Sequence, residues 1–177
     1  MKTSTKAAGG GAILLAVSFI QPWEGLWLTA KVDTIGTGKP VTACYGETEG
    51  IKLGEHFTEA QCTAMLKAKL PRYNAEISRC IHVPISEKER AAFISFSYNV
   101  GPAGFCGSTA LARLNRGDHV GACNALMAWT HAQGRVVKGL VNRRTAERNL
   151  CLQGAQQPVL TFWQKLRLFF LSLFHRS

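Results

Sequence analysis

The chain has 177 residues, of which 46% are hydrophobic, and a formal net charge of +10 at pH 7. This length and apolar content predict a single compact protein and exclude a disordered chain. No stretch reaches the roughly 18 apolar residues of a spanning helix, which excludes a polytopic membrane protein. The basic excess predicts an anionic partner or surface, such as nucleic acid, anionic lipid or bacterial cell wall, with a charge that only keeps the protein soluble as the alternative.

The N-terminal segment has the order of regions that is typical of an export signal. Residues 1–6, which include two lysines, form a short basic region before the mostly apolar stretch Ala7–Ile20, as in signal sequences. Three interpretations stay open for residues 1–20: a cleaved signal, an uncleaved weak membrane anchor, or a buried first helix. The glycines Gly9–Gly11 weaken a helix and an anchor alike.

Residues 26–45 predict a small antiparallel hairpin or sheet. Leu26–Thr29 and Val41–Tyr45 are short runs rich in strand-favouring residues. Between them, Asp33–Pro40 is dense in the glycine, threonine and proline that are typical of turns.

From residue 58 the pattern is helical. Thr58 with Gln61, and Ser86 with Glu89, match the capping box, which satisfies free amides at a helix start. A sheet followed by many helices predicts an α+β protein with its sheet near the N-terminus. The expected helices are Glu59–Leu70 (ended or kinked at Pro71), Arg72–Ile81, one from Glu87 to the terminator Gly101-Pro102, Thr109–Asn115, His119–Thr130 and Gly139–Leu152.

The C-terminal tail forms a separate segment. On a helical wheel, Val159–Ser177 gathers phenylalanine, tryptophan and leucine on one arc, with Lys165, His175 and Arg176 opposite. A basic amphipathic helix of this kind is typical of a membrane surface, although it can also dock on the body of the protein.

Six cysteines are spread through the body without a Cys-x-x-Cys pair, so a zinc site is not expected. Their even number favours disulfides formed in an oxidising compartment, with buried free thiols as the alternative. We favour pairing between neighbours in the sequence, that is Cys44–Cys62, Cys80–Cys106 and Cys123–Cys151.

Two carboxylates lie in contrasting surroundings. Glu24 is flanked by Trp23, Leu26 and Trp27, and burial against them would raise its pKa and let it donate a proton near neutrality. Asp33 follows nine residues later among polar residues that keep it ionised. Glycoside hydrolysis requires such a pair, although two solvated surface carboxylates would give the same pattern.

These residues belong to a longer pattern that resembles the phage-type lysozymes, glycoside hydrolase family 24, and more specifically exported endolysins of the signal-anchor type. The matching residues, between Ile20 and Leu152, are Glu24-Gly25-Leu26, Asp33, Thr42–Thr48, Ser95–Gly101, Ser108-Thr109, Leu114–Asp118, Gly121–Cys123, Trp129, Gly139–Arg144 and Glu147-Arg148.

The resemblance implies a lysozyme-like α+β fold, with a small β hairpin lobe, a larger helical lobe and a cleft between them. It implies cleavage of the β-1,4 bond between N-acetylmuramic acid and N-acetylglucosamine in peptidoglycan. Glu24 would be the general acid, Asp33 the base or charge stabiliser, and Thr42 would place the attacking water. Eight residues separate Asp33 from Thr42, more than is typical of the family, so Thr37 stays the alternative.

Other residues have less specific expectations. Tyr98 and Asn99 would line the cleft by analogy with the family, with a capped helix end and a buried tyrosine ring as the alternative. The basic side chains near the C-terminal end of the body would meet the anionic cell wall, or form a solvated helix face beside Glu147. These side chains are Arg135, Lys138, Arg143, Arg144 and Arg148.

We expect a monomer of phage or prophage origin that uses no cofactor or metal, binds no nucleic acid and acts in the periplasm. Residues 1–20 would be the signal, anchor or first helix, 21–154 the catalytic domain and 155–177 the tail helix. Residues 7–20, and the tail, would contact the inner membrane, and the cleft would assemble only after residues 7–20 leave it. The alternatives are a lytic transglycosylase acting on the same bond and a non-enzymatic cationic protein that disrupts membrane or cell wall.

Overall fold

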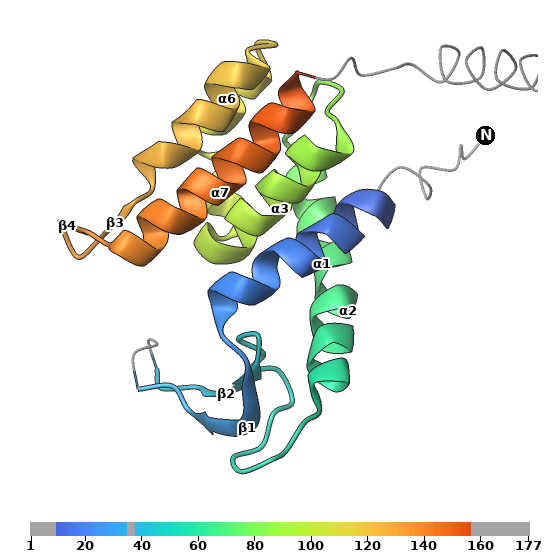
Figure 1. The fold of residues 1–177 in the computed structure, drawn as a ribbon, viewed down its shortest axis with the longest axis vertical. Coiled ribbons are helices and arrows are strands. Elements are labelled where there is room, and N and C mark those ends of the chain that lie inside the picture. The colour runs from blue at the N-terminus through green and yellow to red at the C-terminus, as the bar shows by residue number, and fades with distance from the viewer. Residues whose placement is uncertain (1–9, 35–37, 157–177) are drawn as a thin grey trace, which may run out of the picture.

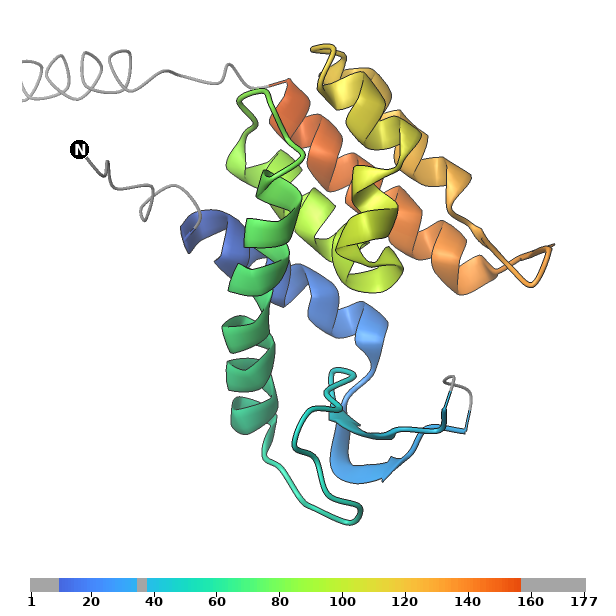
Figure 2. The same ribbon diagram turned by 180° about the vertical axis from the view of Figure 1, so that it is seen from behind.

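The structure, a computed structural model, describes residues 10–34 and 38–156. A small β lobe lies at one end, a larger helical lobe lies at the other, and the long helix α2 runs between them (Figures 1 and 2). Over these residues, every helix is too short or too polar to cross a membrane. Thr37 and the expected tail helix lie outside the described residues.

Helix α1 (Gly10–Glu24) belongs to the core of the protein. Ala12, Ala16, Val17 and Ile20 are buried on one face, at the spacing of an amphipathic helix. This face packs against α2 and α3. In the folded structure, residues 10–20 therefore lie in a helix with one buried face, which continues unbroken to Glu24.

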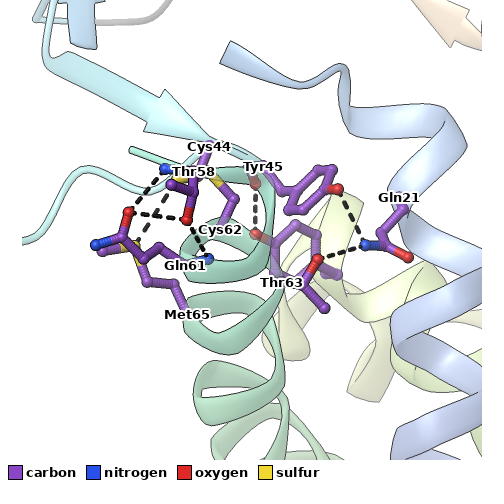
Figure 3. Close-up of a disulfide and its surroundings, with 9 residues drawn as sticks. Gln21, Cys44, Tyr45, Thr58, Gln61, Cys62, Thr63 and Met65 are labelled. Atoms are coloured by element: carbon purple, nitrogen blue, oxygen red, sulfur yellow. Dashed lines mark hydrogen bonds between the residues drawn. A yellow bond between two sulfur atoms is a disulfide. The ribbon is translucent and has the colours of Figure 1, made fainter. Parts of the chain in front are cut away.

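The predicted hairpin is present in the β lobe. Strands β1 (Trp27–Val32) and β2 (Val41–Cys44) pair antiparallel, with Val32 opposite Val41. A disulfide between Cys44 and Cys62 ties β2 to the first turn of α2, as Figure 3 shows.

Helices α2 (Glu59–Ser78) and α3 (Glu87–Val100) begin at the two predicted capping boxes. The helix does not end at Pro71, one of the two outcomes expected there, because α2 continues through it. Pro71 is exposed while Leu70 and Ile77 are fully buried. Burial of the opposite helix face therefore outweighs the amide hydrogen bond that proline cannot make.

The second half of the chain completes the helical lobe around α3. The expected helix over His119–Thr130 ends early and tightens into a 3₁₀ turn, and the short helix α4 and a second hairpin, β3–β4, were not predicted. The elements are α4 (Pro102–Cys106), α5 (Thr109–Leu114), α6 (His119–Ala125), η1 (Leu126–Ala128), β3 (His131–Ala132), β4 (Arg135–Val136) and α7 (Lys138–Ala155).

All six cysteines lie in disulfides, in the neighbour pairing that the sequence favours. Besides Cys44–Cys62, Cys80 just beyond α2 bonds to Cys106 of α4, and Cys123 of α6 bonds to Cys151 of α7. Each disulfide therefore joins two different elements of the fold.

Candidate active site

Glu24 is the last residue of α1, at the point where the chain leaves the helical lobe for the β lobe. Gly25 follows with a φ of 69°, a left-handed conformation that glycine adopts without strain and that turns the chain toward β1. The Glu24 side chain is 20% exposed, and its Oε1 accepts a hydrogen bond of 2.6 Å from Arg143 Nη1. The carboxyl group is therefore accessible from solvent and fixed in place by a cation.

The expected burial of Glu24 between two indole rings is not observed on the Trp27 side. Trp27 is 49% exposed, and the Lys31 ammonium lies over its ring. Trp27 is the first residue of β1, and its indole nitrogen lies beside Gly25. The main charged contact of Glu24 comes instead from α7.

Arg143 and Arg144 are buried, so the prediction that they lie on a basic surface is wrong. Arg143 reaches acceptors in three directions, because Nε donates to Glu147 Oε1 at 3.1 Å and Nη2 to the Ser95 carbonyl at 3.2 Å. Its Nη1 makes the contact with Glu24. A buried cation is stable when its donors are satisfied in this way.

Glu147 is the buried counterpart of the two arginines. It is 0% exposed, accepts from Ser95 Oγ at 2.7 Å, and binds Arg144 Nη1 at 2.5 Å. Burial raises the pKa of Glu147, whereas the guanidiniums of Arg144 and Arg143 act to lower it. With three donors directed at its two oxygens, the ionised form is the better satisfied.

The β hairpin carries the other two candidates. The Asp33 amide donates to the Pro40 carbonyl at 2.8 Å, which closes the loop after β1. Thr42 lies on β2 opposite Lys31. Lys31, on the other strand of the hairpin, precedes Asp33 by two residues. Hairpin pairing thus places Asp33 and Thr42 in the same part of the β lobe.

Tyr98 contributes to the junction between the lobes. Its hydroxyl donates to the Tyr45 carbonyl at 2.7 Å, and its ring lies 5.1 Å from that of Tyr73. Burial, and next the negative charge of Glu24, raise the pKa of Tyr98. Asn99, the next residue on α3, accepts a hydrogen bond from Arg144.

Gln21 strengthens the same junction, because Nε2 donates to Tyr45 Oη at 3.0 Å and to Thr63 Oγ1 at 2.9 Å (Figure 3). Helices α1 and α3 therefore both contact Tyr45, directly after β2, and Gln21 also links α1 to α2. Within residues 10–34 and 38–156, no three histidine, cysteine, aspartate or glutamate side chains gather as a metal site requires.

Comparison with known proteins places the chain in a family. The phage lysozyme family matches residues 21–147. The SAR-endolysins of bacteriophage PS119 and Enterobacteria phage P21 are each 40% identical to the chain, and each alignment covers 88% of this chain and 96% of the relative.

Solved structures agree with the sequence relatives. The muramidase domain of SpmX from Asticaccaulis excentricus superposes with a TM-score of 0.70 at 28% identity, over 82% of this chain and 97% of that domain. A point mutant of P22 lysozyme superposes with a TM-score of 0.70 at 27% identity, over 86% of this chain and 99% of the P22 chain. The chain therefore belongs to the phage lysozyme family and is a peptidoglycan-degrading glycoside hydrolase.

Proposed function

We propose that the enzyme hydrolyses the β-1,4 bond between N-acetylmuramic acid and N-acetylglucosamine, with Glu24 as the proton donor. The observation that carries this proposal is the position of Glu24. Its carboxyl group ends α1 where the two lobes meet, is one-fifth exposed, and is held by a single buried guanidinium. A proton donor needs both features, because the substrate must reach it and its orientation must be fixed.

In this reaction the proton of Glu24 passes to the glycosidic oxygen as the bond to the anomeric carbon breaks. Asp33 stabilises the positive charge that develops on the sugar, or takes a proton from the attacking water. Thr42, on the neighbouring strand, hydrogen-bonds that water. The oxygen of water ends on the anomeric carbon.

Glu24→Gln tests the proton donor directly. Glutamine keeps the size of the side chain and can still accept from Arg143, but it has no proton to give. We expect a loss of about 10²–10⁴-fold in the rate of peptidoglycan cleavage with unchanged circular dichroism. The matched control is Glu49→Gln, at an exposed position of the β lobe, which should retain the full rate. A folded Glu24→Gln protein that cleaves at the wild-type rate would show that Glu24 is not the acid.

We also propose that the protein is exported and that residues 7–20 begin in the inner membrane, which keeps the enzyme inactive. The supporting observation is that Ala12, Ala16 and Ile20 are fully buried in the folded protein. The same apolar side chains cannot lie in lipid and fill this core at once. Glu24 ends α1, the helix that contains residues 10–20. Release of this segment from the membrane would therefore be coupled to assembly of the site at Glu24.

Gly10→Leu tests this coupling. Nothing lies within 4 Å of a Cβ at Gly10, so the folded enzyme should accept leucine while the membrane segment becomes more apolar. We expect more of the variant in the membrane fraction, and low muramidase activity in that fraction. Membrane-bound protein with full activity would contradict the proposal.

A further inference from the structure

Four charged side chains form one cluster behind the candidate active site. Two carboxylates, Glu24 and Glu147, face two guanidiniums, Arg143 and Arg144. Only Glu24 is appreciably exposed, whereas the three residues of α7 are buried. Glu147 is the member that contacts both arginines.

The contacts of Glu147 determine where Arg143 points. A guanidinium is a planar fork, so fixing two of its edges fixes the third. Glu147 holds Nε and the Ser95 carbonyl holds Nη2. The remaining Nη1 is thereby directed at Glu24, at 2.6 Å.

Arg144 brings a second positive charge to the same region. It is 0% exposed, and its guanidinium carbon lies 4.7 Å from the centre of the Phe96 ring. Among the described residues, its Nε has no hydrogen-bond acceptor. A buried cation with an unsatisfied donor is unfavourable unless a nearby anion compensates, and Glu147 Oε2 is that anion.

We propose that Glu147 is a positioning residue for the proton donor, because it directs Arg143 at Glu24 and offsets the charge of Arg144. This inference rests on the proposed role of Glu24. Without Glu147, both guanidiniums would act on Glu24, and the pair would stabilise its carboxylate too strongly for it to keep a proton.

On the side of Glu24 that faces the helical lobe, the main charges come from α7, because the other titratable groups there are neutral. Tyr73 of α2 and Tyr98 of α3 are neutral in the working range, because burial raises the pKa of both phenols. Asp33 of the β lobe, and the ion pair between Glu47 and Lys69 of α2, are left unchanged by substitutions in α7.

Two substitutions in α7 should move the pH–activity profile in opposite directions. Glu147→Gln removes a negative charge, so Glu24 loses its proton more readily and the alkaline limb moves to lower pH, by about one pH unit. Arg144→Met removes a positive charge at similar volume, so the alkaline limb moves to higher pH. The measurement is kcat/KM on purified peptidoglycan as a function of pH.

Controls separate this effect from general damage to the fold. Ser95→Ala removes one hydrogen bond to Glu147 without changing any charge, so it should lower kcat and leave the limb in place. Glu147→Asp keeps the charge and should also leave the limb in place. If Glu147→Gln does not fold, the shift of Arg144→Met to higher pH remains the test. A purely structural role predicts lower activity without opposite shifts.

Limbs that stay in place, or move in the same direction in both variants, would overturn the inference. If Glu24→Gln is inactive and the limbs do not move, the positioning role fails while the proton donor stands. If Glu24→Gln is fully active, the proposed function itself fails.

Discussion

Arg143 is the residue that connects the candidate proton donor to the core of the helical lobe. Lysine at this position keeps the charge, but a single ammonium cannot reproduce the bonds that Nε, Nη1 and Nη2 make in three directions. We expect Arg143→Lys to lower the rate of peptidoglycan cleavage by up to about 100-fold, because Glu24 is no longer held in one orientation. The rate, together with circular dichroism, checks this prediction.

Arg148→Lys is the matched control for that substitution. Arg148 lies one turn further along α7 and donates to Asn124 on α6, away from Glu24. This variant should cleave at close to the wild-type rate. Equal rates in Arg143→Lys and Arg148→Lys would show that the Arg143 contact does not matter for catalysis.

Glu47 should give part of the stability a defined pH dependence. Burial acts to raise the pKa of Glu47, but the amides of Glu49 and Thr48 and the Lys69 ammonium lower it below its ordinary value of 4.5. A carboxyl with a lowered pKa contributes stability above that value, and the contribution is lost as the pH falls. The advantage of the wild type over Glu47→Gln in urea unfolding should therefore shrink as the pH falls below 4.5. An advantage that stays constant into the acid range would contradict this.

At the scale of residues, the sequence predicts the candidates on α1 and the hairpin but not their partners. Glu24, Asp33 and Thr42 lie in short motifs near one another in the chain. Arg143 is 119 positions from Glu24, and no local pattern links them. The arginine pair followed by Glu147, at helical spacing, is a signal of a buried network, but the high charge of that segment favours a solvated face instead.

Among the elements, α7 offers a direct test of how closely it packs on α3. A Cβ at Gly154 would lie 2.3 Å from Ser86 Oγ and 2.8 Å from the Glu89 amide. Gly154→Ala should therefore lower the free energy of unfolding by about 1–3 kcal/mol, because the capping box of α3 must shift. Urea denaturation followed by circular dichroism measures the change.

Gly139, near the start of the same helix, is the control. Nothing lies within 4 Å of a Cβ there, so Gly139→Ala should leave stability unchanged or raise it by up to about 1 kcal/mol. If both variants are equally stable, α7 and α3 are not in close contact at Gly154.

The elements that the sequence predicts are those with strong local signals. Both capping boxes start helices where expected, because the side chain and backbone amides that form them are close in the chain. Helix α4 has five residues and strands β3 and β4 have two each, too few to show a hydrophobic period. At Pro71, tertiary burial outweighs the local preference.

On the scale of the whole molecule, the three disulfides brace the two lobes at separate places. Cys123 and Cys151 are 28 positions apart and join α6 to α7. Replacing both with alanine should lower the free energy of unfolding by about 3 kcal/mol, because the unfolded chain regains the freedom that the closed loop removes. Urea unfolding of oxidised protein measures this, and an unchanged midpoint would contradict it.

The order of a sheet followed by helices correctly predicts an α+β protein with its sheet near the N-terminus, because neighbouring elements in the chain pack together. The two-lobe arrangement is what the resemblance to the phage-type lysozymes implies. The placement of residues 10–20 could not be predicted in the same way. A short apolar helix suits a protein core and a membrane equally, and only the surrounding helices α2 and α3 decide between them in the folded enzyme.

Mass spectrometry of purified peptidoglycan digested in isotopically labelled water tests the central proposal most directly. Hydrolysis assisted by Glu24 predicts fragments that end in reducing N-acetylmuramic acid and carry the label on the anomeric carbon. Fragments ending in unlabelled anhydro-muramic acid would show that the sugar's own hydroxyl, and not water, attacks the bond, and would contradict the proposed reaction.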